Sequence, residues 1–323
     1  MHVLITGGDG FVACALQQRL LADGVAGQKL TRLTLIDRRF AAEPAASAVH
    51  QIIGSITDPA ILEQAFAQPV DILFHLASLP GGAAEKDFAA GLEVNLGATL
   101  GLLEQARKQA QQHAHAPMMI FSSSIAVYGE PGQQTIDDAT PMQPHLSYGA
   151  HKLASEILIK DYSRRGWVDG RILRLPGIVA RPPAPSGLLS AFMSEVFWRL
   201  AAGERFVCPV SREATAWWMS VHCCVDNLLH ATTLSQEQLA QRRDYTLPVL
   251  HLSMAQLIDA LAQTYGTDRL ALVEYAPNAQ LEAGFGRQPP LDARTAQAVG
   301  FTHDGSVAQL IRNAIAGAGA GSA

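Results

Sequence analysis

The chain has 323 residues, of which 48% are hydrophobic and 16% charged, so it can bury one large core or two smaller ones. Its formal net charge is −5 and it has no basic block, which argues against nucleic acid or an anionic membrane as the main partner. No apolar run reaches the ~20 residues of a membrane span, and no signal peptide is recognisable, so we expect a cytoplasmic protein. Its four scattered cysteines predict neither a disulfide framework nor a metal site.

Short runs rich in β-forming residues alternate with longer helical runs, which predicts a parallel sheet covered by helices on both faces. The first strand, expected at residues 2–6, leads into a turn containing Gly7 and Gly10, and a helix then opens with Phe11 and Val12. Small residues in this turn let the backbone approach a pyrophosphate, which the helix N-terminus then faces. The pattern predicts a Rossmann-type doubly wound α/β fold that binds a dinucleotide.

A carboxylate ends the second strand, which is expected at residues 33–37. Asp37 suits the two ribose hydroxyls of NAD and would repel the 2′-phosphate of NADP. Arg38 and Arg39 follow directly and argue for NADP, because arginines there can accept that phosphate, although they also suit a solvated loop. Because the acid terminates the strand, we expect NAD in preference to NADP.

Polar or small residues follow the next two strands, which are expected at residues 49–53 and 71–78. Asp58 is expected to cap the helix that Pro59 begins, and contact with adenine is a compatible second role. Small residues at the end of a strand are typical where backbone lines a bound nicotinamide dinucleotide. The cofactor-binding residues expected there are Leu76, Ala77 and Ser78.

Two further segments carry polar residues toward the predicted site. A helix expected from about 86 to 112 carries Asn95 among apolar neighbours, where it either satisfies backbone groups or serves the site. The fifth strand, starting at Pro117, is expected to break into a serine-rich turn that contains Ser124. Ligands collect beyond the carboxyl ends of parallel strands, so this turn brings hydroxyls to the cofactor, although serines in a turn can also be local backbone caps.

Tyr148 and Lys152 lie four residues apart in a helix expected over residues 146–162, and therefore on one face of it. An ammonium beside a phenol favours the phenolate, so a group with a reference pKa of roughly 10 can act as a base nearer neutral pH. Such pairs also occur on solvated helix faces. The glycine turn and the serine turn upstream favour the catalytic interpretation.

Taken together, these motifs resemble the extended short-chain dehydrogenase/reductases. The matching pieces are Thr6-Gly-Gly-Asp-Gly-Phe11, Asp37, Asp58, His75-Leu-Ala-Ser78, Asn95, the run from Phe121 to Gly129, Tyr148-xxx-Lys152 and Arg174-Leu-Pro176. The resemblance implies that Tyr148 is the acid/base, and that Lys152 binds the nicotinamide ribose and lowers the tyrosine pKa. It also implies that Ser124 holds the reacting oxygen and Asn95 supports a water relay. Pro176 is expected to contact the cofactor.

Beyond Pro176 the patterns become irregular, which indicates a smaller C-terminal substrate-binding region. We expect a nucleotide-binding domain at 1–175 plus about 220–250 and a substrate-binding region at about 176–219 plus 251–323, with a loop at 182–187, helices at 188–202 and 254–265, and a frayed tail at 317–323. The candidates for binding a substrate carboxylate are Arg181, Arg199 and Arg212, each of which also suits a surface ion pair.

Within the family the chain resembles sugar-acid dehydrogenases nearly end to end. This implies NAD-dependent oxidation of the C2 hydroxyl of a four-carbon sugar acid, D-erythronate, to the 2-keto acid, without a metal. Tyr148 would take the hydroxyl proton and Ser124 would bond the oxygen. Two other functions stay open: a nucleotide-sugar epimerase or dehydratase that reduces NAD transiently, and an NAD-binding regulatory protein without turnover. The resemblance also implies a homodimer formed by the helices that carry Asn95 and Tyr148.

Overall fold

The structure is a computed structural model that describes residues 1–44, 46–130, 132, 134–183 and 189–316. The chain forms two compact units. Unit 1 comprises Met1–Val127, Pro144–Arg174 and Leu228–Tyr245, and unit 2 comprises Tyr128–Gln143, Leu175–Asn227 and Thr246–Ala323. The expected tail at 317–323 and most of the expected loop at 182–187 lie outside the described residues.

The boundary between the units departs from the expected one at residues 128–143, which cluster with unit 2. The cause is backbone pairing with a distant segment: the amide of Ile136 donates to the carbonyl of Pro290 at 2.9 Å, and the amide of Asp292 donates to the carbonyl of Ile136 at 2.8 Å. Residues 220–227, expected in the first domain, also belong to unit 2.

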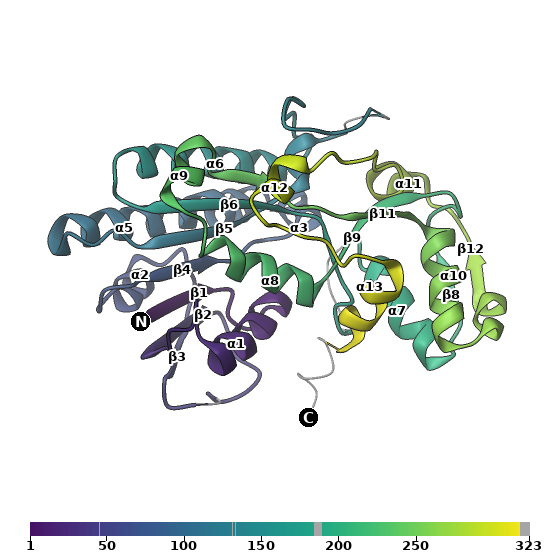
Figure 1. The fold of residues 1–323 in the computed structure, drawn as a ribbon, viewed down its shortest axis with the longest axis horizontal. Helices are drawn as coiled ribbons and strands as arrows, with labels where there is room; N and C mark the ends of the chain where they lie inside the picture. The colour runs from purple at the N-terminus through teal and green to yellow at the C-terminus, as the bar shows by residue number, and fades with distance from the viewer. Residues whose placement is uncertain (45, 131, 133, 184–188, 317–323) are drawn as a thin grey trace. The chain divides into compact units, whose positions relative to one another are not determined.

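Unit 1 is built on a seven-stranded sheet (Figure 1). Its strands are β1 (His2–Thr6), β2 (Arg32–Asp37), β3 (Val49–Ile53), β4 (Ile72–His75), β5 (Met118–Ser124), β6 (Asp169–Leu175) and β10 (Asp244–Thr246). Their order is β10-β6-β5-β4-β1-β2-β3, and the pairs β1–β2, β1–β4, β2–β3 and β4–β5 are parallel. This order is that of a doubly wound nucleotide-binding sheet, so the predicted Rossmann-type fold is confirmed.

Helices cover both faces of this sheet. They are α1 (Phe11–Asp23), α2 (Pro59–Ala65), α3 (Gly81–Lys86), α4 (Phe88–Leu92), the π-helix η1 (Glu93–Gly97), α5 (Ala98–His113), the 3-10 helix η2 (Ile125–Tyr128), α6 (Ser147–Arg164) and α9 (Gln236–Gln241). Figure 1 shows α5 and α6 on one face and α1 on the other. Leu4 and Ile36 pack with α2, α5 and α6, while the alternating Val3, Ile5 and Leu35 are also buried, so both faces are apolar.

The prediction of one continuous helix from about 86 to 112 is wrong. The backbone leaves the helical conformation at Asp87 (φ −132°), whose carboxylate then caps α4 by accepting a hydrogen bond from the amide of Ala90 at 3.0 Å. The π-helix at Glu93–Gly97 next interrupts the run before α5 begins. Such single π turns are frequent at functional sites, and this one carries Asn95.

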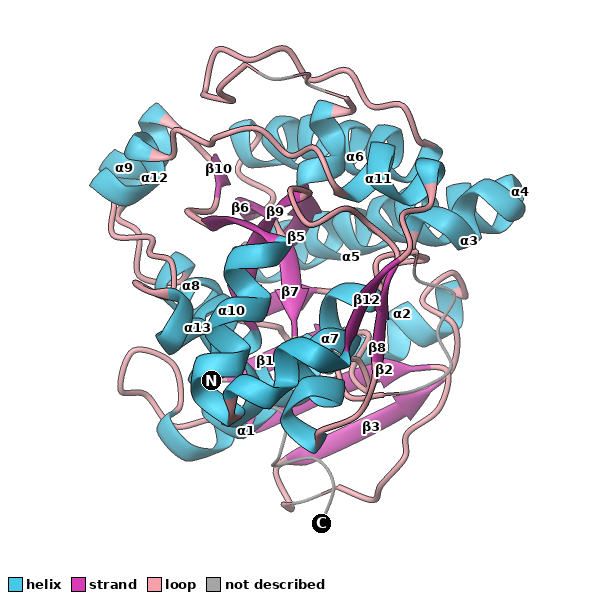
Figure 2. Cartoon of the chain, turned by 90° about the vertical axis from the view of Figure 1, so that its right-hand side faces the viewer, coloured by secondary structure: helices cyan, strands magenta, loops and turns pink. Residues whose placement is uncertain are grey.

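Unit 2 contains two small sheets, with orders β11-β9-β7 and β12-β8. Its elements are β7 (Gly177–Val179), α7 (Phe192–Ala202), β8 (Phe206–Cys208), β9 (Thr215–Ser220), most of α8 (Val221–Ala231), β11 (Leu250–Ser253), α10 (Met254–Tyr265), η3 (Thr267–Leu272), β12 (Val273–Tyr275), α11 (Ala279–Phe285), α12 (Arg294–Ala298) and α13 (Val307–Ala316). Figure 2 shows α7 beside α10, and buried residues of α7, α10 and α13 belong to one apolar cluster that includes Trp218. Among the described residues, no helix is both long and apolar enough to cross a membrane.

Candidate active site

In the turn after β1, the backbone lies close to the backbone of the segment that follows β4. Gly7 has a φ of +72°, and a Cβ at this position would lie 2.9 Å from the Cα of Ala77, in the segment that follows β4. A Cβ on Gly10 would lie 3.0 Å from the carbonyl oxygen of Gly7. Gly7 therefore requires glycine, and a side chain at Gly10 would crowd the backbone of the same turn, as expected for a turn that closes on a pyrophosphate.

The first helix of unit 1 starts directly at this turn. Gly10 is its N-cap, Phe11 and Val12 are its first two residues, and no described side chain caps it by a hydrogen bond. The first turn of α1 contains no acidic residue either. No carboxylate within the helix therefore offsets the positive end of the helix dipole. These features fit the binding of dinucleotide phosphates.

Asp37 is the last residue of β2 and Asp58 follows β3, so both lie at the carboxyl ends of parallel strands. The carboxylate of Asp37 accepts hydrogen bonds from the amides of Asp9 (3.0 Å) and Arg38 (2.7 Å), which ties the glycine turn to the end of β2. Asp58 caps α2 by accepting a hydrogen bond from the amide of Ala60 at 2.9 Å, so the predicted cap is confirmed. Arg38 is exposed, as is the neighbouring Arg39.

Tyr148 lies in the first turn of α6 among residues from two strand ends. Its hydroxyl shares hydrogen bonds with Ser124, the last residue of β5, and with Ser78, which follows β4. Burial raises the pKa of the phenol, and these two hydrogen bonds act in the opposite direction. The structure therefore brings three predicted site residues together, but the direction of the tyrosine pKa shift differs from the lowering that the resemblance implied.

Lys152 is fully buried one helical turn after Tyr148. Its Nζ donates a hydrogen bond to the backbone carbonyl of Ser122 at 2.6 Å, and it lies 5.7 Å from the centroid of the Tyr148 ring and 4.6 Å from that of Phe121. Burial lowers the pKa of the ammonium to about 7, and the carboxylate of Glu156 acts in the opposite direction. The charge of this ammonium is therefore sensitive to its surroundings near neutral pH.

Asn95 makes its side-chain hydrogen bonds to a single backbone segment. Its Oδ1 accepts from the amide of Leu79 at 2.7 Å, and its Nδ2 donates to the carbonyl of Leu79 at 3.0 Å. Its own carbonyl accepts from the hydroxyl of Thr99 at 3.0 Å. Asn95 thus satisfies backbone groups of the segment that follows β4, as one of its two expected roles requires.

A buried chain of hydrogen bonds through His75 links the glycine turn to Asn95, and the sequence patterns gave no sign of it. The amide of Ala77 donates to the hydroxyl of Thr6 (3.2 Å), which lies 2.7 Å from His75 Nδ1, and His75 Nε2 lies 3.0 Å from the hydroxyl of Thr99. Because Thr99 already donates to Asn95, it must accept from Nε2–H, so Nδ1 accepts from Thr6. The neutral Nε2–H tautomer satisfies every group in the chain.

Four further predicted residues belong to unit 2. Pro176 lies between β6 and β7. The carbonyl of Arg181 accepts a hydrogen bond from Nε1 of Trp198 at 2.7 Å, and burial lowers the pKa of the Arg181 guanidinium. Arg212 lies 4.0 Å from Asp259. The guanidinium of Arg199 pairs with two carboxylates, those of Glu195 and Glu204, as its alternative role as a surface ion pair requires.

This fold, with its glycine turn, its acidic strand end and its tyrosine and lysine on one helix, is that of an extended short-chain dehydrogenase/reductase. The chain belongs to the NAD dependent epimerase/dehydratase family, whose model matches residues 3–246.

Two named relatives are similar over almost the whole chain. D-erythronate dehydrogenase from Cupriavidus necator is 38% identical over 318 residues, which cover 97% of both chains. D-erythronate dehydrogenase from Haemophilus influenzae is 33% identical over 320 residues, which cover 98% of this chain and 99% of the relative. A solved structure, described as the nucleoside-diphosphate-sugar epimerase from Agrobacterium tumefaciens, is 33% identical and has a TM-score of 0.93, covering 100% of this chain and 95% of that one.

Proposed function

We propose that this protein oxidises the C2 hydroxyl of a four-carbon sugar acid, with D-erythronate as the substrate and NAD as the hydride acceptor. The observation that carries the chemistry is the meeting of Tyr148 with Ser124 and Lys152 at the end of β5. The substrate class is supported by two relatives named D-erythronate dehydrogenase, each of which matches nearly end to end.

The cofactor would be held by residues at the carboxyl ends of the first four strands of unit 1. The glycine turn and the start of α1 would bind the pyrophosphate, Asp37 the adenosine ribose, and Asp58 the region of the adenine. Lys152 would bind the nicotinamide ribose. The other proposed contacts are Leu76, Ala77, Ser78 and Pro176. NAD, when bound, supplies the acceptor for the hydride that leaves C2.

Proton transfer is the part of the reaction assigned to the chain itself. Tyr148, as phenolate, takes the proton of the C2 hydroxyl, and the hydroxyl of Ser124 donates a hydrogen bond to the oxygen that becomes the carbonyl. The phenolate needs a neighbouring cation because burial alone raises the tyrosine pKa. Lys152, whose Nζ is 5.7 Å from the ring centroid, supplies that charge.

The epimerase function remains the second candidate because the similar solved structure is named as a nucleoside-diphosphate-sugar epimerase. An epimerase reoxidises its cofactor in every cycle, whereas a dehydrogenase releases NADH. The test is therefore the absorbance at 340 nm with NAD, and in parallel NADP, across four-carbon sugar acids including D-erythronate. A rise with D-erythronate and NAD supports the proposal. A flat trace from protein that binds NAD supports the epimerase function.

Tyr148→Phe tests the catalytic assignment. We expect NAD binding to persist and turnover to fall by about 10² to 10⁴-fold, as loss of a general acid/base does. Tyr162→Phe is the matched control, because Tyr162 lies on the same helix and its hydroxyl bonds to Glu104 rather than to the serines. Near-normal turnover by Tyr148→Phe would refute the role.

The remaining parts of the proposal concern substrate contacts, assembly and location. We propose Arg181 and Arg212 as the contacts of the substrate carboxylate, so Arg181→Met should raise KM more than it lowers kcat. We also propose a cytoplasmic homodimer formed through α4, α5 and α6. These helices expose large apolar side chains that a partner would cover: Phe88, Leu92, Leu100 and Ile157.

A further inference from the structure

One stripe of α6 is joined to the end of β5 by three successive polar contacts. The stripe residues are four positions apart, so they lie one above another on the helix. The contacts are the hydroxyl of Tyr148 with that of Ser124, Nζ of Lys152 with the carbonyl of Ser122 (2.6 Å), and the hydroxyl of Ser123 with Oε1 of Glu156 (2.5 Å). Glu156 is the member of this stripe to which the proposed reaction gives no role.

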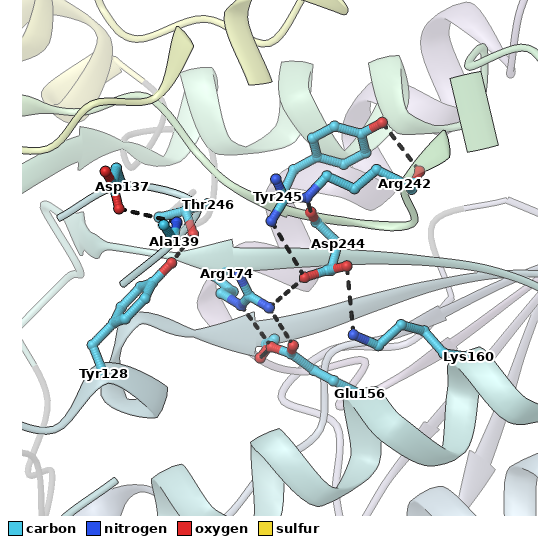
Figure 3. A network of polar contacts seen from close by, with 11 residues as sticks. Tyr128, Asp137, Ala139, Glu156, Lys160, Arg174, Arg242, Asp244, Tyr245 and Thr246 are labelled. Atoms are coloured by element: carbon cyan, nitrogen blue, oxygen red, sulfur yellow. Dashed lines mark hydrogen bonds and ion pairs between the residues drawn. The ribbon is translucent and has the colours of Figure 1, made fainter. Parts of the chain in front are cut away.

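Glu156 is completely buried, and its charge is matched by an equally buried arginine (Figure 3). Nε of Arg174 donates to Oε1 at 3.0 Å, and Nη2 donates to Oε2 at 2.6 Å, which is the bidentate geometry of a strong ion pair. The same Nη2 donates to Asp244 at 2.5 Å. Arg174 lies on β6 and Asp244 on β10, so the network crosses two neighbouring strands.

The two carboxylates of this network have different surroundings. Asp244 lies near further cations, whereas Glu156 lies next to the active site. Asp244 lies 3.5 Å from Nζ of Lys160 and 3.8 Å from Nη2 of Arg242, both partly exposed. Glu156 instead shares Arg174 with Asp244 and lies one helical turn from Lys152. Two buried cations, Lys152 and Arg174, thus accompany the two carboxylates.

Neither His75 nor Tyr148, the other titratable groups near Lys152, supplies a negative charge that would stabilise its ammonium. His75 is held neutral, because burial and then the charge of Lys152 lower its pKa to about 3. Tyr148 is protonated at neutral pH, because burial raises its pKa. Glu156 is the carboxylate whose charge opposes the effect of burial on Lys152.

We propose that Glu156 is a positioning residue: its carboxylate keeps Lys152 charged and, through Ser123, fixes the serine end of β5 against α6. Arg174 holds the carboxylate in place by binding both of its oxygens. The proposal rests on the proposed acid/base role of Tyr148 only for its effect on turnover. Its effect on Lys152 is a property of the folded protein without substrate.

The first measurement is the titration of Lys152 by NMR in protein labelled with [ε-13C]lysine. The chain contains five lysines, and the Lys152→Met variant identifies the signal. In Glu156→Gln, which keeps the shape of the side chain and can still accept from Ser123, we expect the midpoint of Lys152 to move to lower pH by at least about 0.5 unit. An unchanged midpoint in folded Glu156→Gln protein would overturn the proposal.

Two variants separate charge from shape. Glu156→Asp keeps the charge, and its midpoint should stay nearer to that of the wild type than the midpoint of Glu156→Gln does. Asp161→Asn removes a carboxylate from the surface of the same helix, where it pairs with Arg164 and Arg165, and should leave the midpoint unchanged. A purely structural role for Glu156 predicts no difference between Gln and Asp at this position beyond stability.

Loss of Glu156 removes one of the two carboxylates that Arg174 binds, which can prevent folding. The same comparison is therefore made in an Arg174→Gln background, where that cation is absent. The midpoint of Lys152 should be lower in the double variant than in Arg174→Gln alone. Equal midpoints in these two proteins would contradict the proposal.

Turnover gives an independent readout once a substrate is known. Removing a nearby anion favours loss of a proton from either member of the Tyr148–Lys152 pair, so the acid limb of the oxidation rate should move to lower pH in Glu156→Gln. A limb that stays in place while the NMR midpoint moves would leave the effect on Lys152 intact and refute the acid/base role of the pair. Failure of the proposed function is thus distinguishable from failure of this inference.

Discussion

His75 makes the stability of unit 1 dependent on pH in a calculable way. Burial, with a smaller contribution from the charge of Lys152, lowers its pKa to about 3 from the ordinary value of 6.5. Between these two values the unfolded chain binds a proton that the folded chain does not. The free energy of unfolding therefore falls as pH drops through 6.5 toward 3, and this histidine alone removes about 2 kcal/mol between pH 7.5 and pH 5.

The assay is urea unfolding followed by circular dichroism at pH 7.5 and pH 5, in the wild type and in His75→Asn. The variant should be less stable at pH 7.5, because the hydrogen bonds to Thr6 and Thr99 are altered, but its loss on acidification should be smaller by about 2 kcal/mol. His113→Asn, at the exposed end of α5, is the control and should retain the full loss. An equal loss in His75→Asn and in the wild type would refute the reasoning.

Three further substitutions test other features. Gly7→Ala should raise the NAD dissociation constant at least about tenfold, because Gly7 has a φ of +72° and a Cβ there would clash with Ala77. Gly166→Ala is the control and should leave that constant unchanged, because Gly166 shares the positive φ without a clash. Asp58→Ala should lower the free energy of unfolding by about 1 kcal/mol in urea titrations, through loss of the α2 cap. Asp304→Ala should lower the free energy of unfolding by about 2 kcal/mol in the same assay, because the buried amide of Ser220, which donates to Asp304 at 2.9 Å, loses its acceptor. A negligible change in the Asp58 or the Asp304 variant would contradict the assigned contact.

The parts of the site that the sequence predicted are those set by local patterns. Glycines at fixed spacing, an acid at a strand end and Pro59 after Asp58 each have a short-range physical meaning, and the strands at 2–6 and 49–53 have the expected bounds. The helix at 254–265 also has the expected bounds, and in the structure Ser253 forms a capping box with Gln256 at its start.

The parts that the sequence did not predict depend on contacts between distant residues. The π turn at 93–97 was not visible in an apolar pattern, because the two hydrogen bonds between Asn95 and Leu79 that accompany it require the folded segment after β4. The ion pairs of Arg174 were equally hidden, because Glu156 and Asp244 lie 18 and 70 positions away. Likewise, the raised pKa of Tyr148 comes from burial, which spacing along a helix does not reveal.

The last strand of the unit 1 sheet is synthesised long after the others. Residues 175–227 of unit 2 emerge between β6 and β10, yet the amide of Ile172 on β6 finds its acceptor at Arg243, 2.8 Å away. Until β10 is synthesised, the edge of the sheet at β6 has no strand paired to it, and Arg174 lacks Asp244, one of its two carboxylates. A ribosome-bound chain that ends before residue 244 should therefore be cleaved by protease within unit 1, and protection should appear only once β10 has left the exit tunnel.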